Sequence, residues 1–208
     1  VPILDGSAAP FVRGIMQRGL RALNAPVRAF EMLKEVTVTD GEASATLRPS
    51  DTLRIDFEID FADAAIGHQQ KSLVMNNGSF ARELCDSRTF CRQADVIAMQ
   101  ANGLALGGNP GKNAVVFDGD RVLSPGGLRH SDEPVRHKML DALGDLALAG
   151  APLIGHYVGV RAGHSLTNTL LRKVFATPDA VRMVICDAQQ SRRLPGYGLV
   201  WDEIPQVA

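Results

Sequence analysis

Histidine and carboxylate side chains recur at helical spacing in the stretch HKMLDALGD, residues 137–145. His137, Asp141 and Asp145 are four residues apart, so on a helix they stack along one stripe. An imidazole nitrogen and a carboxylate oxygen one turn apart can bind one cation, and Zn²⁺ accepts both ligands. The same spacing also suits an ordinary ion pair on a solvated helix face. The spacing alone leaves these two alternatives open.

The neighbours of this stripe favour partial burial. Apolar residues flank it on nearly every side, namely Met139, Leu140, Leu143 and Leu148. A half-buried carboxylate is costly unless a metal ion or a histidine partners it. We therefore expect these polar side chains to face a partner rather than open water.

His164 is a second candidate for chemistry. It lies in RAGHSLTN, after a predicted strand and at the start of a predicted helix, beside the small residues Ala162 and Gly163. The positive end of the helix dipole lies at this position, and the small neighbours leave room for a substrate. The alternative is a surface or capping histidine. Asp145 would orient the imidazole if the strand brings the two together. The other histidines are interpreted as structural: His68, His130 and His156.

Two further motifs are excluded. The Gly107-Gly108 pair lacks phosphate-loop spacing and does not lead into a helix, so we predict a tight turn there. No G-x-S-x-G nucleophile motif occurs. A hydrolase with this sequence would therefore use an activated water.

The elements that must position these residues follow from hydrophobic patterning. Residues 133–149 predict the longest helix, which starts with Glu133-Pro134 and stops at Gly150. Residues 53–61 alternate apolar and charged side chains, as in an antiparallel strand with one wet face. Asp-Gly dipeptides predict hairpins near residues 40–41 and 118–119. Further strands are predicted at 70–76 and 154–161, and further helices at 79–90, 92–103, after a cap at Ser7 and after a cap near Ser165.

This order of elements predicts an α+β fold, with helices packed on one face of a small, mostly antiparallel sheet in a two-layer sandwich. Residues 1–25 are interpreted as the remnant of an N-terminal domain, a helix and a linker. Residues 26–208 are predicted to form the C-terminal α+β domain that carries the H-K-x-x-D helix. From Cys186 onward no periodicity is evident.

Composition excludes several classes of protein. The 208 residues contain 22 Lys+Arg and 23 Asp+Glu, and no basic run, so nucleic acid is not an expected partner. The three cysteines show no C-x-x-C spacing, which argues against a thiolate zinc site and favours a reducing, cytoplasmic compartment. No apolar run approaches the roughly 20 residues of a transmembrane helix.

Several motifs together resemble one family. In chain order they are LDGSAAPFV, SRTF, GLALGG, VRHKMLDALGDL and AGHSLTN. This set resembles the UDP-3-O-acyl-N-acetylglucosamine deacetylases, zinc-dependent hydrolases of lipid A biosynthesis, from Val1 to about Phe175. The resemblance implies a metal-dependent amidohydrolase that releases acetate from the N-acetyl amide of an acylated UDP-sugar. It also implies a two-domain protein with the active site between the domains.

The resemblance also implies roles for individual residues. His137 and Asp141 match two zinc ligands, although a His/Asp pair accepts Fe²⁺ as well. The catalytic positions are an oxyanion-stabilising lysine and threonine, a histidine that stabilises the transition state or protonates the leaving amine, and the aspartate that holds it: Lys138, Thr89, His164 and Asp145. Residues matching UDP-sugar contacts are Asp60, Phe61 and Arg161, with Arg161 replacing a usual lysine. Residues matching the acyl passage are Phe90, Val96, Gly108 and Val116.

The sequence departs from the family in one respect. The family's third zinc ligand and general-base glutamate lie in a short N-terminal-domain motif that has no counterpart in these residues. Catalytic zinc sites usually have three protein ligands and a water. We therefore expect a missing N-terminal domain to complete the site, and the isolated 208 residues to bind zinc weakly and hydrolyse little. The alternative is a non-catalytic truncated homologue that binds the acylated UDP-sugar or a protein partner.

Overall fold

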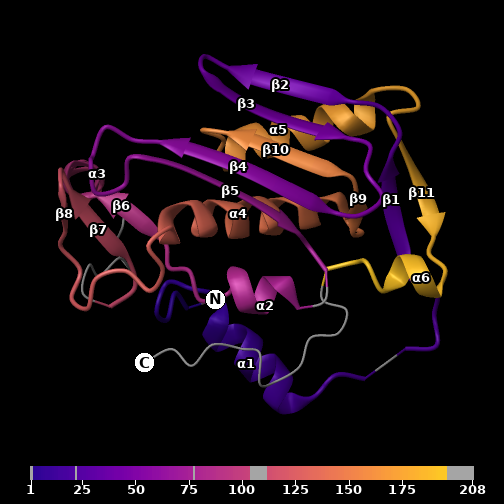
Figure 1. Cartoon of the computed structure of the whole chain (residues 1–208), viewed down its shortest axis with the longest axis horizontal. Coiled ribbons are helices and arrows are strands. Elements are labelled where there is room, and N and C mark those ends of the chain that lie inside the picture. The colour runs from indigo at the N-terminus through magenta and orange to yellow at the C-terminus, as the bar shows by residue number, and fades with distance from the viewer. Residues whose placement is uncertain (1, 22, 77, 104–111, 196–208) are drawn as a thin grey trace.

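A five-stranded sheet with helices on one face forms the centre of the molecule (Figure 1). The computed structural model describes residues 2–21, 23–76, 78–103 and 112–195. The strand order is β2-β3-β10-β4-β5, and every neighbouring pair is antiparallel except β10 with β4. The strands are β2 Val36–Asp40, β3 Ala43–Arg48, β4 Arg54–Asp60, β5 His68–Val74 and β10 His156–Val160. The predicted α+β class and the mostly antiparallel sheet are confirmed.

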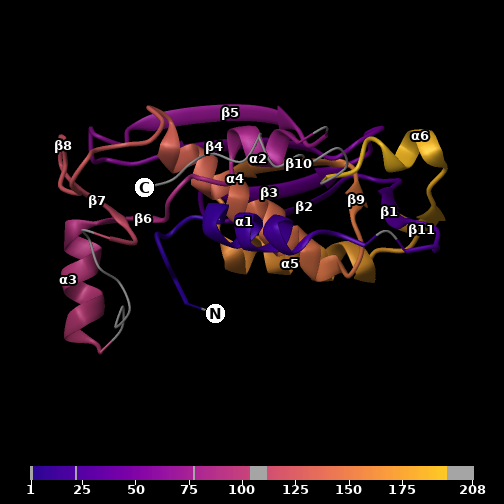
Figure 2. The same cartoon turned by 90° about the horizontal axis from the view of Figure 1, so that it is seen from below.

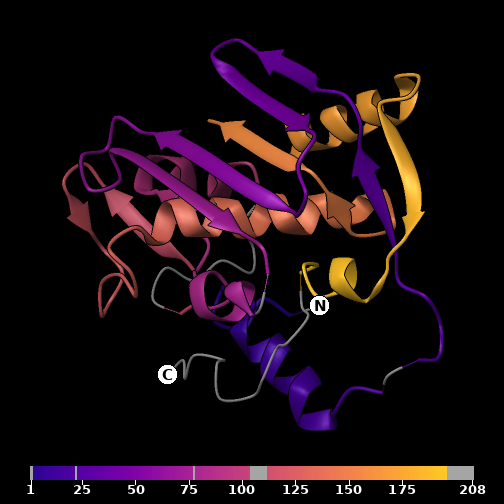
Figure 3. The ribbon, with the colours of Figure 1, turned by 45° about the vertical axis from the view of Figure 1, so that its right-hand side comes forward.

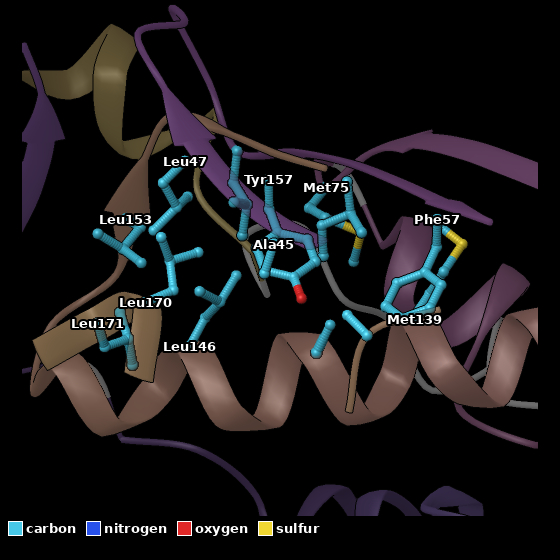
Figure 4. Packing of buried hydrophobic residues seen from close by; sticks show 14 of the residues in the cluster. Ala45, Leu47, Phe57, Met75, Met139, Leu146, Leu153, Tyr157, Leu170 and Leu171 are labelled. Carbon is cyan, nitrogen blue, oxygen red and sulfur yellow. The ribbon is translucent and has the colours of Figure 1, made fainter. Parts of the chain in front are cut away.

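Two helices pack on the apolar face of this sheet. α4 Glu133–Leu146 contacts β4 and β5, whereas α5 His164–Ala176 contacts β2 and β3. The alternation of β4 places Ile55, Phe57 and Ile59 in the core. Figure 4 shows Phe57 next to Met139 on the apolar stripe of α4, which also includes Leu146. The opposite face of β4 carries the charged residues, as the alternation predicts.

Two smaller sheets lie at opposite ends of the central sheet (Figures 1 and 2). At one end, β1 pairs with β11 antiparallel and with β9 parallel (Figure 3). At the other end, β6, β7 and β8 form a sheet next to α3. Their bounds are β1 Arg28–Met32, β9 Leu153–Ile154, β11 Val181–Ile185, β6 Phe90–Arg92, β7 Val115–Asp118, β8 Arg121–Val122 and α3 Gln93–Ala101.

The N-terminal helix packs on the side of α4 away from the sheet (Figure 1). α1 Ala9–Arg18 contacts α2 Ser79–Glu83 and its following turn through Ala9, Ala81 and Cys85. An apolar cavity of about 640 Å³ is lined mainly by α4 and by the segment 147–153 that follows it, with Ala8 and Phe80 at its edge. β1 then starts the sheet-forming part of the chain at Arg28. The division of the chain at residue 25 stays a prediction.

Several predicted elements differ from the structure. The helix predicted at 79–90 ends at Glu83, because the following residues form long-range hydrogen bonds to α4. The long helix changes to a 3₁₀ turn, η1 Ala147–Ala149, after Leu146. The last predicted helix starts at His164, one residue before the predicted cap. β11 and the short helix α6 Ala188–Ser191 were not predicted, although Asp187 and Gln190 form a capping box.

The strand predicted at 154–161 is divided between two sheets. β9 belongs to the sheet of β1, whereas β10 lies at the centre of the five-stranded sheet. The backbone passes Met32 closely at Gly155, where an added Cβ would lie 2.7 Å from Met32 Cγ. Within β10, Tyr157 is fully buried and its hydroxyl contacts Thr167 Oγ1 on α5 at 2.9 Å. Among the described residues, no helix is long and apolar enough to cross a bilayer.

Gly159 on β10 provides a test of the core packing. It lies opposite Phe57 of β4, and a Cβ there would come within 2.7 Å of Phe57 Cε2 and 2.9 Å of Tyr157 Cε1. Gly159→Ala should therefore lower the free energy of unfolding by about 1–3 kcal/mol, measured by urea denaturation.

Gly14→Ala is the matched control, because a Cβ at Gly14 on α1 would meet no atom within 4 Å. That variant should be neutral or more stable by up to about 1 kcal/mol. Equal unfolding free energies for the two variants would contradict the packing argument.

Candidate active site

The polar stripe of α4 is partly buried. It carries His137, Asp141 and Asp145, and it extends one turn back to Glu133. His137 is 8% exposed, and the Asp141 and Asp145 side chains are 21% and 17% exposed. These fractions exclude a fully solvated ion-pair face, because each group is largely removed from water. The stripe therefore forms a wall of a site.

His137 has a defined orientation. Its Nδ1 lies 3.0 Å from the Ser87 carbonyl oxygen, so Nδ1–H donates to that oxygen. The neutral ring then keeps a lone pair on Nε2. Nε2 lies 3.3 Å from Asp141 Oδ1. A carbonyl that holds one ring nitrogen while the other faces a ligand is typical of metal-binding histidines.

The His137–Asp141 pair fits a zinc ion. Ligand atoms about 2.0–2.1 Å from Zn²⁺ at tetrahedral angles are about 3.3–3.4 Å apart. The Nε2–Oδ1 separation of 3.3 Å agrees with that spacing. Within residues 2–195, apart from 22, 77 and 104–111, no group of three His, Cys, Asp or Glu side chains gathers around one point. The described part of the chain thus offers two candidate metal ligands, whereas a catalytic zinc site usually has three protein ligands.

Asp145 and His164 meet at the next turn of α4. His164 Nδ1 lies 2.9 and 3.0 Å from the two Asp145 carboxylate oxygens, so Nδ1–H donates a hydrogen bond to the Asp145 carboxylate. The strand β10 and the start of α5 bring the two residues together, which was the condition for Asp145 to orient the His164 imidazole. The His164 side chain is 68% exposed, so its Nε2 edge is accessible. The catalytic roles of both residues stay predictions.

Lys138 lies in the same place. A narrow depression is lined by Lys138, Asp141, Asp145, Gly163 and His164. The Lys138 ammonium lies 6.0 Å from the centroid of the Phe57 ring, a cation–π distance. A positive charge and an accessible imidazole therefore face one small volume beside the His137–Asp141 pair.

The segment that contains Thr89 runs past the first turns of α4. Arg88 forms a two-pronged ion pair with Glu133, with Nε–Oε1 2.9 Å and Nη2–Oε2 3.0 Å. Thr89 donates its backbone N–H to Gly6 and accepts from Val115 through its carbonyl. Thr89 is two residues from Ser87, whose carbonyl holds His137. The structure thus anchors the Thr89 segment beside the stripe.

Aromatic residues connect the predicted acyl and sugar contacts to His137. The Phe90 ring meets His137 edge-on at 6.4 Å between centroids and meets Phe61 at 5.7 Å. Val96 and Val116 are buried. Gly108 lies outside the described residues. Phe61 and Phe90 are therefore brought to the site.

Asp60 and Arg161 pair with each other. Arg161 Nη2 lies 2.5 Å from Asp60 Oδ2, and Arg161 also contacts Glu42 at the tip of the β2–β3 hairpin. Arg161 has a positive φ of 49°, which non-glycine residues rarely adopt. It lies three residues before His164 in the chain. Asp60, Phe61 and Arg161, the three predicted UDP-sugar contacts, thus lie at the ends of strands β4 and β10.

The remaining histidines have carboxylate partners elsewhere. His68 contacts Glu58, His130 contacts Asp86, and His156 contacts Asp56. His156 also accepts from Arg48 through Nδ1, so both of its ring nitrogens are engaged. These contacts agree with the structural reading of all three histidines.

Three contributors to the site were not predicted from the sequence. Phe57 lies beneath Lys138, and its inward position followed from the alternation of residues 53–61. Glu133 lies one turn before His137, so the four-residue spacing could have extended the stripe to it. No sequence signal marks the Ser87 carbonyl, because a backbone oxygen is present at every residue.

Comparisons with known proteins point to one family. Residues 1–176 match the family model described as LpxC, UDP-3-O-acyl N-acetylglycosamine deacetylase. Three curated proteins named UDP-3-O-acyl-N-acetylglucosamine deacetylase are similar to this chain. The Phenylobacterium zucineum protein is 51% identical over 88% of this chain and 62% of its own length. The Shewanella oneidensis protein is 41% identical over 94% of this chain and 66% of its own length. The Pseudomonas entomophila protein is 45% identical over 88% of this chain and 61% of its own length. The chain thus spans less than two thirds of each relative.

The ion pair at Glu133 predicts acid sensitivity. Burial alone would raise the pKa of Glu133, but the Arg88 guanidinium and the backbone N–H groups of Arg88 and Arg129 hold the pKa below its ordinary value of 4.5. Because the folded pKa is depressed, this stabilisation is fully present above the unfolded value and is lost as pH falls through the folded pKa. The free energy of unfolding should therefore decrease below about pH 4.5.

Urea denaturation between pH 7 and pH 3 measures this effect. Glu133→Gln should flatten the acid limb of the stability profile, whereas Glu35→Gln, on an exposed loop residue, should leave it unchanged. Parallel acid limbs for the wild-type protein and Glu133→Gln would contradict the assignment.

Proposed function

Because the chain belongs to the UDP-3-O-acyl N-acetylglycosamine deacetylase family, we propose that it forms part of an enzyme that hydrolyses the N-acetyl amide of UDP-3-O-acyl-N-acetylglucosamine. The reaction releases acetate and serves lipid A biosynthesis. One observation carries the proposal: a single helix presents the His137–Asp141 pair and, one turn on, the Asp145–His164 pair. We also propose a cytoplasmic location, which the free thiols of Cys85, Cys91 and Cys186 favour.

His137 and Asp141 would hold the metal ion, either Zn²⁺ or Fe²⁺. When bound, zinc supplies a water with a pKa of about 7 and polarises the carbonyl of the amide. We propose that residues outside these 208 provide the third ligand and the general base. The greater length of the relatives and the two-ligand set among the described residues support this proposal.

The residues of this chain would manage protons and negative charge. With Nδ1–H held by Asp145, His164 can deliver a proton from Nε2 to the leaving amine. The Lys138 ammonium and the Thr89 hydroxyl would donate to the oxyanion of the tetrahedral intermediate. The depression that holds Lys138 and His164 excludes part of the solvent, which strengthens both interactions.

The substrate would lie along two groups of residues. Arg161 and Asp60 are placed to contact the UDP-sugar, with the guanidinium available to a diphosphate. Phe61 and Phe90 offer an apolar surface that leads to His137, which suits an acyl chain next to the reacting amide. These assignments follow the family positions and their arrangement around α4.

A second candidate function is a non-catalytic homologue that binds the acylated UDP-sugar or a protein partner. The two-ligand metal set among the described residues is the observation that favours it. The two functions differ in hydrolysis of the substrate by the longest protein that the coding sequence supplies. Hydrolysis supports the enzyme, and stoichiometric substrate binding without hydrolysis supports the alternative.

Replacement of His137 tests the metal ligand. His137→Ala removes the Nε2 donor, so Zn²⁺ binding measured by calorimetry should be lost. His68→Ala, which removes an exposed histidine of β5, should keep the wild-type metal content. Unchanged metal binding in His137→Ala would refute the ligand assignment.

Replacement of Asp145 tests the orientation of His164. Asp145→Asn keeps the shape but no longer favours the Nδ1–H form, so kcat should fall about 100-fold with little change in KM. Asp179→Asn, at an exposed carboxylate, is the control and should keep wild-type kcat. The assay follows acetate release in the longest natural form of the protein, and equal kcat values would exclude the role.

A further inference from the structure

The peptide bond between Ser87 and Arg88 is held at both ends by α4. Its carbonyl oxygen accepts from His137 Nδ1 at 3.0 Å, and its N–H donates to Glu133 Oε1 at 2.9 Å. The two side chains are four residues apart, which is one helical turn. Because the carbonyl and the N–H belong to one planar unit, a rotation of that plane would break both hydrogen bonds.

The Glu133 carboxylate is saturated with donors. It is 1% exposed and accepts from the Arg88 backbone N–H, the Arg88 Nε and Nη2 groups, and the Arg129 backbone N–H. Two carboxylate oxygens offer about four acceptor sites, so this geometry uses them all. Arg88 Nη2 also donates to the Gly127 carbonyl at 2.7 Å. The position of the Ser87–Arg88 peptide is therefore fixed by α4 and by the loop that precedes it.

We propose that Glu133, together with Arg88, is a positioning residue for His137. By fixing the orientation of the Ser87–Arg88 peptide, Glu133 selects the ring form of His137 that carries its proton on Nδ1. The Nε2 lone pair then points away from the backbone and is free for a metal ion. The inference rests on the proposed function only in naming a metal ion as the partner of Nε2.

The neighbouring residue Asp132 provides the control, because it forms ion pairs that do not involve the Ser87–Arg88 peptide. Asp132 also lies at the start of α4 and also binds basic groups, at 3.0 Å from Lys71 Nζ and 2.5 Å from Arg136 Nε. The side-chain partners of Asp132 are Lys71 of β5 and Arg136 of α4, and neither belongs to the Ser87–Arg88 peptide. Asp132→Asn therefore removes a comparable ion pair without touching the support of His137.

The experiment compares Glu133→Gln with Asp132→Asn in the metal-free 208-residue protein. Nuclear magnetic resonance of ¹⁵N-labelled histidine, at about pH 8.5 where an ordinary imidazole is neutral, reports which ring nitrogen carries the proton. The wild-type protein and Asp132→Asn should show His137 with the proton on Nδ1. Glu133→Gln should show a mixture of the two ring forms, because the amide keeps only one acceptor oxygen for four donors, and its N–H₂ group must face either the Arg88 or the Arg129 donors.

Zinc affinity provides a second readout. Loss of an outer contact of a metal-binding histidine typically weakens metal affinity 10- to 100-fold. The dissociation constant for Zn²⁺ should therefore rise about 10-fold or more in Glu133→Gln and remain near the wild-type value in Asp132→Asn. If the 208-residue protein binds Zn²⁺ too weakly to measure, as a two-ligand set allows, the ring-form measurement alone decides the role of Glu133. The proposed function fails separately if the longest natural form of the protein binds no Zn²⁺.

Several outcomes would overturn the proposal. A wild-type His137 that carries its proton on Nε2 contradicts it directly. So does a Glu133→Gln protein that loses stability but keeps the wild-type ring form, since that is a structural role only. An equal change of the His137 ring form in Asp132→Asn would also contradict the proposal, because that variant leaves the Ser87–Arg88 peptide untouched. If Glu133→Gln does not fold, Glu133→Asp keeps the charge but is one methylene shorter, and it must shift the ring form in the same direction.

Discussion

The packing of α4 against the five-stranded sheet fixes the direction of every other side chain on that helix. Met139 and Leu146 are buried against β4 and its neighbours, so the helix cannot rotate without exposing apolar surface. Such a rotation would cost roughly 1.5–3 kcal/mol for each large side chain exposed. The polar stripe is therefore aimed by the hydrophobic core, and its precision comes from residues that have no chemistry of their own.

Three of the four polar groups on that stripe have a partner from another part of the chain, whereas Asp141 pairs with His137 within the helix. Glu133 and His137 meet the loop after α2, whereas Asp145 meets the start of α5. Half-buried charges without partners would be costly in this environment. The need for partners therefore favours the loops that can supply them next to α4. The helix thus organises two loops that are about 75 residues apart in the sequence, Ser87 and His164 being the contacts.

The sequence predicts the parts of this site that depend on local patterns. The alternation of residues 53–61, the Asp-Gly hairpins and the long helix all follow from spacing and turn chemistry, and all are present. The end of α2 at Glu83 was missed because the next residues bond to α4 rather than continue the helix. The contact between His164 and Asp145 was predicted only if the strand now seen as β10 brought the two residues together. Local periodicity carries no information on such long-range contacts. The Ser87 carbonyl could not be found at all.

The position of β10 determines when the central sheet can be completed. β3 and β4 are consecutive in the chain but do not pair, because β10 lies between them in the sheet. During synthesis the edges of both strands stay open until residues 156–160 emerge, more than 90 residues after β4. Contacts of such sequence separation slow folding, and open strand edges favour association with other chains. The arrangement that places Gly159 beside Phe57 therefore makes completion of the sheet depend on the synthesis of residues 156–160.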